Sequence, residues 1–186
     1  MKALIVSGSR NPQGQTGRAA EALLAGLRAA GASGEMVFLP TLKIERCRQC
    51  DAAGWGLCRQ EGHCVIEDDF AGLVERLRAA DAAIFATAVY FADLSESLRA
   101  FLDRLRRTCR HDLGKKGLAD KAALGLCVAG GGGGGAPACT QSLERVLLTC
   151  GFDVVDMVPV RRQNLDMKLD VLRTTGRWLA TRPPVR

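Results

Sequence analysis

The sequence lacks any apolar run near the roughly 18 residues that a membrane span needs, so no span is predicted. The apolar run at its start covers only residues 3–6, too few for a secretory signal, and we expect a cytoplasmic protein. The chain is also poor in aromatic residues, with six Phe, two Trp and one Tyr in 186 residues. Because arginines and aromatics do not alternate, no nucleic-acid partner is predicted.

Two common nucleotide-binding motifs are missing from the loop at residues 7–16. No Gly-Lys-Ser/Thr closes it as in a Walker A sequence, and it is not a G-x-G-x-x-G turn. The loop does follow an apolar strand, precede a helical pattern and lack carboxylates. Backbone N–H groups at such a helix N-terminus, with the hydroxyls of Ser7, Ser9 and Thr16, predict an anion-binding site. The alternative is an ordinary strand-to-helix turn with Thr16 as the N-cap.

Disulfides are not expected in a cytosolic chain, so its eight cysteines are better explained as metal ligands, redox groups or core thiols. Half of them fall within eighteen residues: Cys47, Cys50, Cys58 and Cys64. Four thiolates can hold a [4Fe-4S] cluster or zinc, and His63 could replace one thiol at zinc. Free thiols in a loop are the third alternative. The other four, Cys109, Cys127, Cys139 and Cys150, are interpreted as core or incidental thiols.

The net charge of +6 is concentrated in one basic stretch within residues 104–116. Its members are Arg104, Arg106, Arg107, Arg110, Lys115 and Lys116. Such a stretch is typical of a solvated helix face, and it could also steer an anionic ligand.

Strand and helix patterns alternate along the chain and predict one α/β domain over residues 1–186. Strands are expected at residues 3–6, 35–40, 82–89, 122–129 and 152–160, and helices at 15–30, from a cap at 68 or 69, and at 95–107, 140–150 and 168–180. Right-handed crossovers then give a doubly wound parallel sheet of five strands in the order 2-1-3-4-5. Ligands of such sheets bind at the carboxyl ends of the strands, where loops 7–16, 87–96 and 130–137 should meet.

Two of these loops suit a flat ligand. The loop after the third strand places the only tyrosine, Tyr90, beside Phe91, although such a pair can also serve only to cover the end of a sheet. Residues 130–135 are six consecutive glycines, whose backbone amides can approach a ring closely. A mobile loop, or a dinucleotide fingerprint with Asp153 as its acidic residue, are the alternatives.

These features resemble the NAD(P)H-dependent FMN reductase and iron-sulfur flavoprotein group of the flavodoxin-like superfamily. The first loop is similar to the group's G-S-P-R-x-x-G-N-T, with Arg10 in place of proline and Gln15 in place of asparagine. The second is similar to P-V-Y-F, with Ala88 in place of proline, and residues 98–104 are similar to the following helix L-K-x-F-x-D-R. The glycine run takes the position of the group's third flavin-contacting loop.

The resemblance implies a flavodoxin-like fold that binds FMN. It implies FMN contacts from Ser9, Arg10, Gln15, Thr16, Ala88, Val89, Tyr90, Phe91, Gly131 and Gly132. It also implies an oxidoreductase that accepts hydride from NAD(P)H and reduces a quinone, flavin or similar small molecule, with no protein acid or base in the hydride step. A homodimer or homotetramer is expected.

The cysteine-rich loop, at about residues 45–66, departs from the resemblance in its spacing. Seven residues separate Cys50 from Cys58, whereas the iron-sulfur members have two between their second and third thiols. An iron-sulfur cluster, zinc and no metal therefore all stay open. Two other functions are weighed against the enzyme: an electron carrier without its own substrate, and a zinc-stabilised interaction protein. Because such carriers are usually acidic, the basic charge favours the enzyme.

Overall fold

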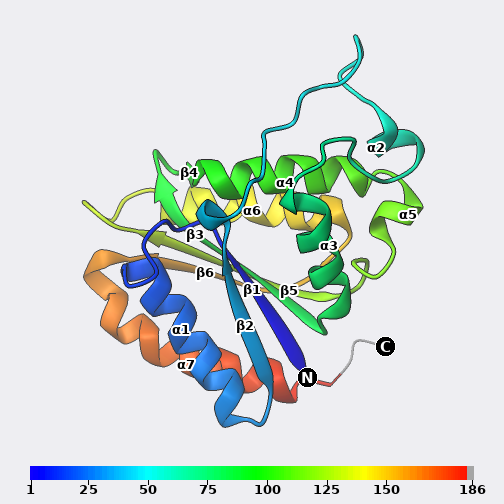
Figure 1. Cartoon of the computed structure of the whole chain (residues 1–186). Coiled ribbons are helices and arrows are strands. Elements are labelled where there is room, and N and C mark those ends of the chain that lie inside the picture. Colours follow the sequence, from blue (N-terminus) through cyan, green and yellow to red (C-terminus); the bar gives the residue numbers. More distant parts are fainter. Residues whose placement is uncertain (184–186) are drawn as a thin grey trace.

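The fold is built on a parallel sheet, seen in a computed structural model that describes residues 1–183 (Figure 1). Its long strands are β1 (Lys2–Ser7), β2 (Ser33–Phe38), β3 (Ala82–Tyr90), β5 (Ala122–Ala129) and β6 (Asp153–Arg161). They lie in the order β2-β1-β3-β5-β6, so the predicted order 2-1-3-4-5 is confirmed for the five long strands. A sixth strand, β4 (Asp93–Leu94), was not predicted and pairs antiparallel with the end of β3.

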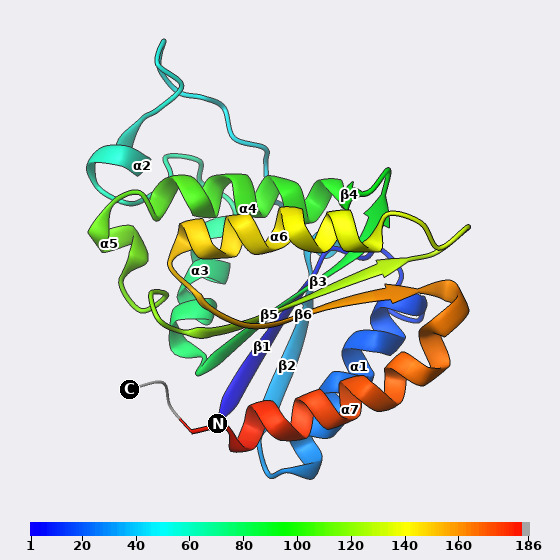
Figure 2. The same cartoon turned by 180° about the vertical axis from the view of Figure 1, so that it is seen from behind.

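Helices cover both faces of the sheet, as Figures 1 and 2 show from opposite sides. Two of them, α1 (Gln15–Ala29) and α7 (Leu165–Thr181), pack together on one face. The other face carries α3 (Asp69–Ala79), α4 (Glu96–Thr108) and α6 (Ala136–Cys150). Within residues 1–183, no helix has both the length and the apolar character needed to cross a bilayer.

The strand sequences explain this layering. In β1, Leu4 and Val6 belong to the core under α3, α4 and α6, whereas Ala3 and Ile5 belong to the core under α1 and α7. Alternate side chains of a strand point to opposite faces, so a strand that is apolar throughout must be covered on both. All four side chains are fully buried, which is why the central strands appear as continuous apolar runs.

Several element ends differ from the prediction. The second strand is Ser33–Phe38, two residues earlier than expected, and the short 3-10 turn η1 (Leu39–Thr41) follows it. Helix α6 begins at Ala136 rather than at residue 140, because Pro137 fits the first turn of a helix, where no donor is needed. Helix α7 begins at Leu165 rather than at residue 168, directly after the turn η2 (Arg162–Asn164).

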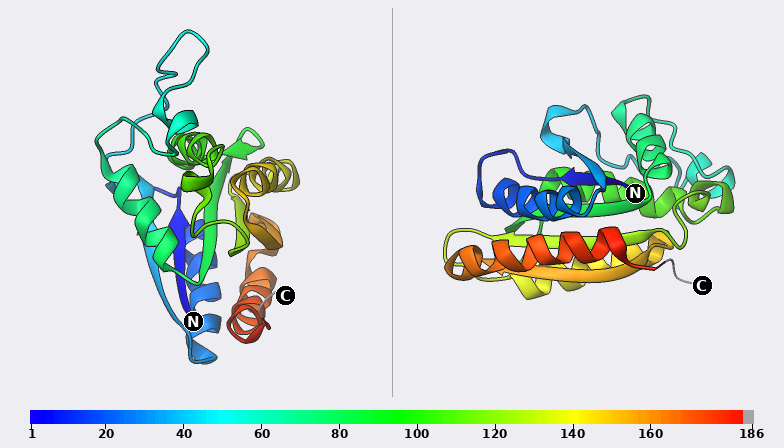
Figure 3. Two further views of the ribbon diagram at one scale, coloured as in Figure 1. Left: turned by 90° about the vertical axis from the view of Figure 1, so that its right-hand side faces the viewer. Right: turned by 90° about the horizontal axis from the view of Figure 1, so that it is seen from below.

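The segment between η1 and α3 contains the cysteine-rich stretch. It includes one short helix, α2 (Leu57–Gln60), and lies beside α5 (Asp112–Lys115), and neither helix was predicted. Figure 3 shows this segment projecting from the sheet and its helices near one end of α4.

Candidate functional site

A cavity of about 520 Å³ opens at the carboxyl ends of β1, β3 and β5. The three loops expected to meet there all contribute to its wall: Ser9, Gln15, Thr16, Ala88, Val89, Tyr90, Val128, Ala129, Gly130, Gly131, Gly132, Gly133 and Gly134. The volume lies within the usual range for small-molecule sites. The sheet order therefore brings together segments more than a hundred residues apart in the sequence.

The first loop leaves the N-terminus of α1 without a cap. Its N-cap residue is Gly14, whose position supplies no side-chain hydrogen bond, so the alternative with Thr16 as the N-cap is wrong. The loop is held instead by Asn11, whose carbonyl oxygen accepts from the Gly14 N–H at 3.1 Å and the Ser9 hydroxyl at 3.2 Å. Unsatisfied N–H groups and the positive end of the helix dipole thus face an anion that enters the cavity.

Gln15 contributes an unsatisfied acceptor to the same wall. Its Oε1 atom is buried and has no hydrogen-bond partner among the described residues. Buried polar atoms in folded proteins are almost always hydrogen-bonded. An orphaned side-chain oxygen beside a cavity therefore indicates a ligand that carries a donor.

The glycine loop is fixed from behind and open in front. Arg161 Nε donates to the Gly133 carbonyl at 2.7 Å, and Gln163 Nε2 donates to the Gly132 carbonyl at 2.9 Å. In front, a Cβ atom added at Gly131 or Gly132 would meet no atom within 4 Å. Side chains at these positions would occupy the space that a ligand needs, so glycine keeps the cavity wide.

A strained hairpin forms the third side. Phe91 and Ala92 lie between β3 and β4 with φ of 49° and 64°, the positive values of a two-residue type I′ turn. Residues other than glycine adopt this conformation only when their surroundings enforce it. Here Asp93 is paired with Arg99, and Gly135 lies so close to Ala92 that a Cβ on Gly135 would be 2.7 Å from the Ala92 Cα.

Eight of the ten residues predicted to contact FMN line the cavity, and Arg10 and Phe91 do not. Phe91 is fully exposed at 104%, because the type I′ turn directs it outward, whereas Tyr90 lines the wall. Three further lining residues, Gly130, Gly133 and Gly134, belong to the loop 130–137 that was expected there, whereas Val128 and Ala129 were not predicted. Val128 and Ala129 could have been found, because they end a strand next to the one that carries Tyr90. FMN contact by any of these residues stays a prediction.

A larger hollow, of about 670 Å³, lies between α1, β2 and α7 and is closed at one end by Pro12 and Gln13 of the first loop. Its wall includes Met36 and Phe38 of β2 and Leu169 of α7. None of its lining residues comes from the ends of β3 or β5. Only the smaller cavity lies where parallel sheets of this order bind their ligands.

The four clustered cysteines share a third, much smaller cavity. Cys47, Cys50, Cys58 and Cys64 all line it, together with Arg48, Leu57, Val65, Ile66, Arg104 and Arg107. Among residues 1–183, however, no three His, Cys, Asp or Glu side chains are arranged to hold a metal ion. His63, the alternative zinc ligand, faces Glu61 at 3.6 Å and is not in the wall. The thiols are thus of the right kind and in one place, without forming a coordination shell.

Arg104 corrects the interpretation of the basic stretch as a solvated face. Its side chain is only 1% exposed and forms a two-pronged ion pair with Asp68, with Nη1–Oδ2 at 2.6 Å and Nη2–Oδ1 at 2.9 Å. Burial raises the pKa of Asp68, but hydrogen bonds from Arg104 and from the backbone of Glu45 and Phe70 outweigh it and lower that pKa. Arg106, with a side chain 42% exposed, does match the prediction.

The four remaining cysteines are free and buried, as the prediction of core thiols requires. The hydrogen bond with Cys139, together with burial, raises the pKa of Cys127, and Cys109 acts in the same way on the pKa of Cys150. Cys127 and Cys150 are therefore neutral thiols at physiological pH.

Comparison with known proteins identifies the family. Residues 1–165 match the family described as NADPH-dependent FMN reductase. The chain belongs to this family. An iron-sulfur flavoprotein of Methanosarcina thermophila is 31% identical over 121 residues, which cover 65% of this chain and 59% of that protein. Another, from Methanocaldococcus jannaschii, is 30% identical over 162 residues, 86% of this chain and 75% of that protein. This family is the one that the sequence motifs resemble, so the resemblance is confirmed.

The fold of this family member is also found in solved structures. The NAD(P)H:quinone oxidoreductase from Methanothermobacter marburgensis superposes with a TM-score of 0.72 and 22% identity, covering 100% of this chain and 99% of that one. At this identity the likeness concerns the fold alone. The chain spans 59% of the length of the M. thermophila relative, so part of that protein has no counterpart in the match.

Proposed function

We propose that the 520 Å³ cavity binds FMN and that the chain is an oxidoreductase, with NAD(P)H as electron donor and a quinone, flavin or similar small molecule as acceptor. The uncapped N-terminus of α1 in the cavity wall is the observation that carries this proposal. Family membership supports the cofactor, and the name of the M. marburgensis neighbour supports the donor and the acceptor class.

The lining residues would hold different parts of FMN. The first-turn N–H groups of α1 and the Thr16 hydroxyl would bind the phosphate, joined by the Ser9 hydroxyl once it turns from the Asn11 carbonyl. Gln15 Oε1 would accept from a donor on the ligand, which removes its unsatisfied state. Tyr90 and the glycine loop would flank the ring.

Bound FMN supplies the hydride-accepting ring, and the protein supplies binding and orientation. The described cavity wall contains no Asp, Glu, His, Lys or Cys, and its only titratable side chain is Tyr90. This composition supports a site in which the chain orients the reactants without transferring a proton through an acid or base of its own.

The direct test is a fluorescence titration of flavin-free protein with FMN, followed by assays of NADH and NADPH oxidation with a quinone. Stoichiometric binding and acceptor-dependent oxidation support the proposal. Binding of FMN without NAD(P)H oxidation would favour the electron carrier, and no binding at micromolar FMN would refute the flavin site.

Ser9→Ala and Thr16→Ala are each expected to weaken FMN binding by about 1–3 kcal/mol, because each removes a hydrogen bond to a charged group. The same titration measures this loss. Thr41→Val, in the η1 turn, is the control, since Thr41 donates to Phe38 O and is absent from the cavity wall. Parental FMN affinity in both alanine variants would contradict the phosphate-binding role.

We further propose that Cys47, Cys50, Cys58 and Cys64 bind a [4Fe-4S] cluster, with zinc as the alternative. The shared cavity and the names of the relatives support this assignment, although the sulfur atoms would have to move closer to coordinate a metal. Thiolate donors are suitable for either group. If neither binds, the chain is an FMN reductase with a cysteine-rich loop, and if zinc binds without flavin, it is the zinc-stabilised interaction protein.

Replacing any one of these four cysteines with alanine is expected to remove the whole metal complement, because a bound cluster or zinc requires its full set of ligands. Iron, zinc and acid-labile sulfide are measured after anaerobic purification. Cys150→Ala is the matched control, since Cys150 is buried in the core. Independent, partial losses in the four variants would contradict a common site.

The remaining expectations concern the whole protein. One domain over residues 1–186, a homodimer or homotetramer and a cytoplasmic location stay predictions from the sequence and the resemblance. Gel filtration with light scattering measures the oligomeric state.

A further inference from the structure

The cysteine-rich segment leaves and rejoins the fold through a narrow neck. On the incoming side, the N–H of Lys43 donates to Asp69 Oδ2 at 2.7 Å, and the N–H of Glu45 donates to Asp68 Oδ2 at 2.8 Å. The Asp69 N–H donates back to the Lys43 carbonyl at 3.0 Å. The two ends of the segment are therefore joined directly to each other ahead of α3.

Arg104 spans this neck from α4. Its Nη1 donates to the Glu45 carbonyl at 3.2 Å on the incoming side, and its Nη2 donates to the Ile66 carbonyl at 3.3 Å on the outgoing side. The same guanidinium binds Asp68 in two-pronged fashion and lies 4.2 Å from the Phe70 ring centroid. One side chain thus connects both ends of the segment to one helix.

One donor of Arg104 is left over. Its Nε is buried without a hydrogen-bond partner among the described residues, and Arg104 is part of the wall of the four-cysteine cavity. Buried N–H groups are almost always hydrogen-bonded. The four sulfur atoms line the same cavity as Arg104, so we infer that sulfur is the acceptor for this N–H.

The charge of the cavity wall also favours thiolates. Three arginines, Arg48, Arg104 and Arg107, line it with the four cysteines, and the described wall contains no carboxylate. Arg107 also fixes the outer part of the segment, since its Nη1 donates to the Gly54 carbonyl at 2.5 Å and its guanidinium lies over the Trp55 ring. A cationic wall stabilises thiolates and the net negative charge of a metal bound by four of them.

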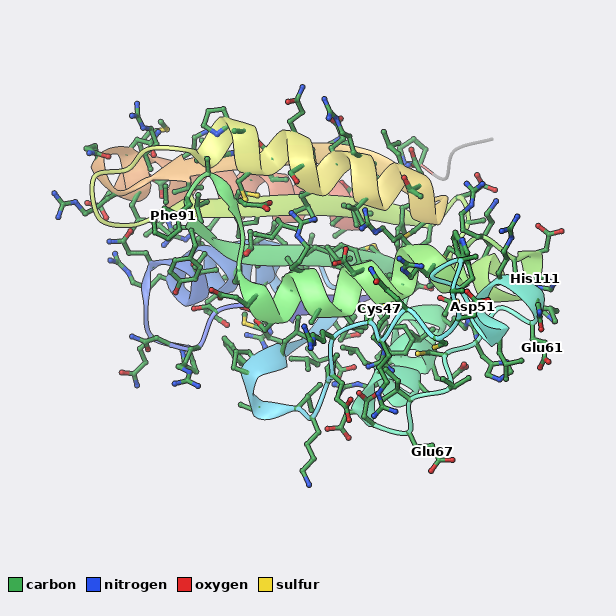
Figure 4. The ribbon with its side chains drawn as sticks, turned by 90° about the horizontal axis from the view of Figure 1, so that it is seen from above. Cys47, Asp51, Glu61, Glu67, Phe91 and His111 are labelled. Atoms are coloured by element: carbon green, nitrogen blue, oxygen red, sulfur yellow. The ribbon has the colours of Figure 1, made fainter. Side chains whose placement is uncertain are left out.

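We propose that Arg104 is the positioning residue of the four-cysteine cavity, joining the two ends of the cysteine-rich segment and offering its free Nε–H to the sulfur atoms assembled there. This role rests on the proposed metal-binding function of the cysteines, but the pinning of the segment does not require the metal to be present. Figure 4 shows Cys47 beside the ribbon of α4, the helix that carries Arg104.

The test compares the full-length parent with Arg104→Lys and Arg104→Gln, using Co²⁺ alone as the probe for the metal-free protein. Thiolate-to-cobalt absorption reports binding, and removal of a group that orients metal ligands is expected to weaken it by about 10- to 100-fold. Lysine keeps the charge but lacks the Nε–H and the planar fork, so it is expected to weaken binding as well. Arg106→Gln, on the same helix but exposed, is the control.

A second measurement tests whether Arg104 holds the cysteine-rich segment in place in the metal-free protein. The rates at which the four clustered cysteines react with a maleimide are followed by mass spectrometry, and both Arg104 variants are expected to react faster than the parent. Unchanged helical circular dichroism shows that the variants are folded. Equal maleimide rates in the parent and Arg104→Lys would overturn the positioning role. Absence of metal and of cobalt binding in the parent overturns only the metal proposal, and the rates still decide the role of Arg104.

Discussion

Gly17→Ala is expected to abolish FMN binding at micromolar concentrations while leaving the sheet and its helices intact. Gly17 lies in the first turn of α1, and a Cβ there would be 1.8 Å from the carbonyl oxygen of Pro12. That neighbour is backbone, so the alanine can be accommodated only if the loop that approaches the cavity moves. Two charge-assisted hydrogen bonds lost from the phosphate correspond to about 3 kcal/mol or more, at least about a hundredfold in affinity.

Gly72→Ala is the matched control for this substitution. Gly72 also lies inside a helix, α3, and a Cβ there would meet nothing within 4 Å. Alanine at such a site should stabilise the protein by about 0.5–1 kcal/mol, with no change in FMN affinity. FMN titration and thermal unfolding of both variants make the comparison. Parental affinity in Gly17→Ala would refute the assignment of this loop as the phosphate site.

Arg104→Met is expected to lower the free energy of unfolding by about 3–5 kcal/mol, because it leaves the Asp68 carboxylate buried without its cation. Both partners are nearly inaccessible, with side chains 1% and 5% exposed, so water cannot replace the lost contacts. Urea unfolding of the metal-free protein measures the change.

The control for this prediction is Arg106→Met on the same helix. Arg106 forms a partly exposed pair with Asp103, three residues before it, with side chains 42% and 29% exposed, and solvent-accessible pairs contribute about 1 kcal/mol or less. Similar losses in the two variants would mean that the buried pair has no special weight in stability.

The order of the long strands could be predicted because it depends on features that a sequence records directly. Apolar runs such as Leu4 to Val6 identify strands buried on both faces, and the helices between them require right-handed crossovers. The short elements could not be predicted in this way. The two residues of β4 and the four of α2 are held by tertiary contacts, and their sequences have no periodicity to detect.

The candidate site likewise contains residues that the sequence indicates and residues whose placement it does not indicate. Ser9, Gln15 and Thr16 follow a strand end directly, and strand ends gather at one edge in any sheet of this order. The outward direction of Phe91 depends instead on positive φ values in a turn without glycine, which local sequence preferences do not indicate. Nor could the burial of Arg104 be predicted, since it belongs to a stretch with many other cations and its partner Asp68 lies 36 positions away.

Under the proposed function, the uncapped end of α1 would also connect this protein's lifetime to its ligand supply. A glycine N-cap such as Gly14 costs a few tenths of a kcal/mol relative to a side-chain cap, and an anion bound there adds its own binding energy to the folded state alone. At a free ligand concentration a hundredfold above Kd, that gain is about 2.7 kcal/mol. A cell short of the ligand would therefore hold a larger unfolded fraction open to proteases, so the abundance of the protein would follow the availability of its cofactor.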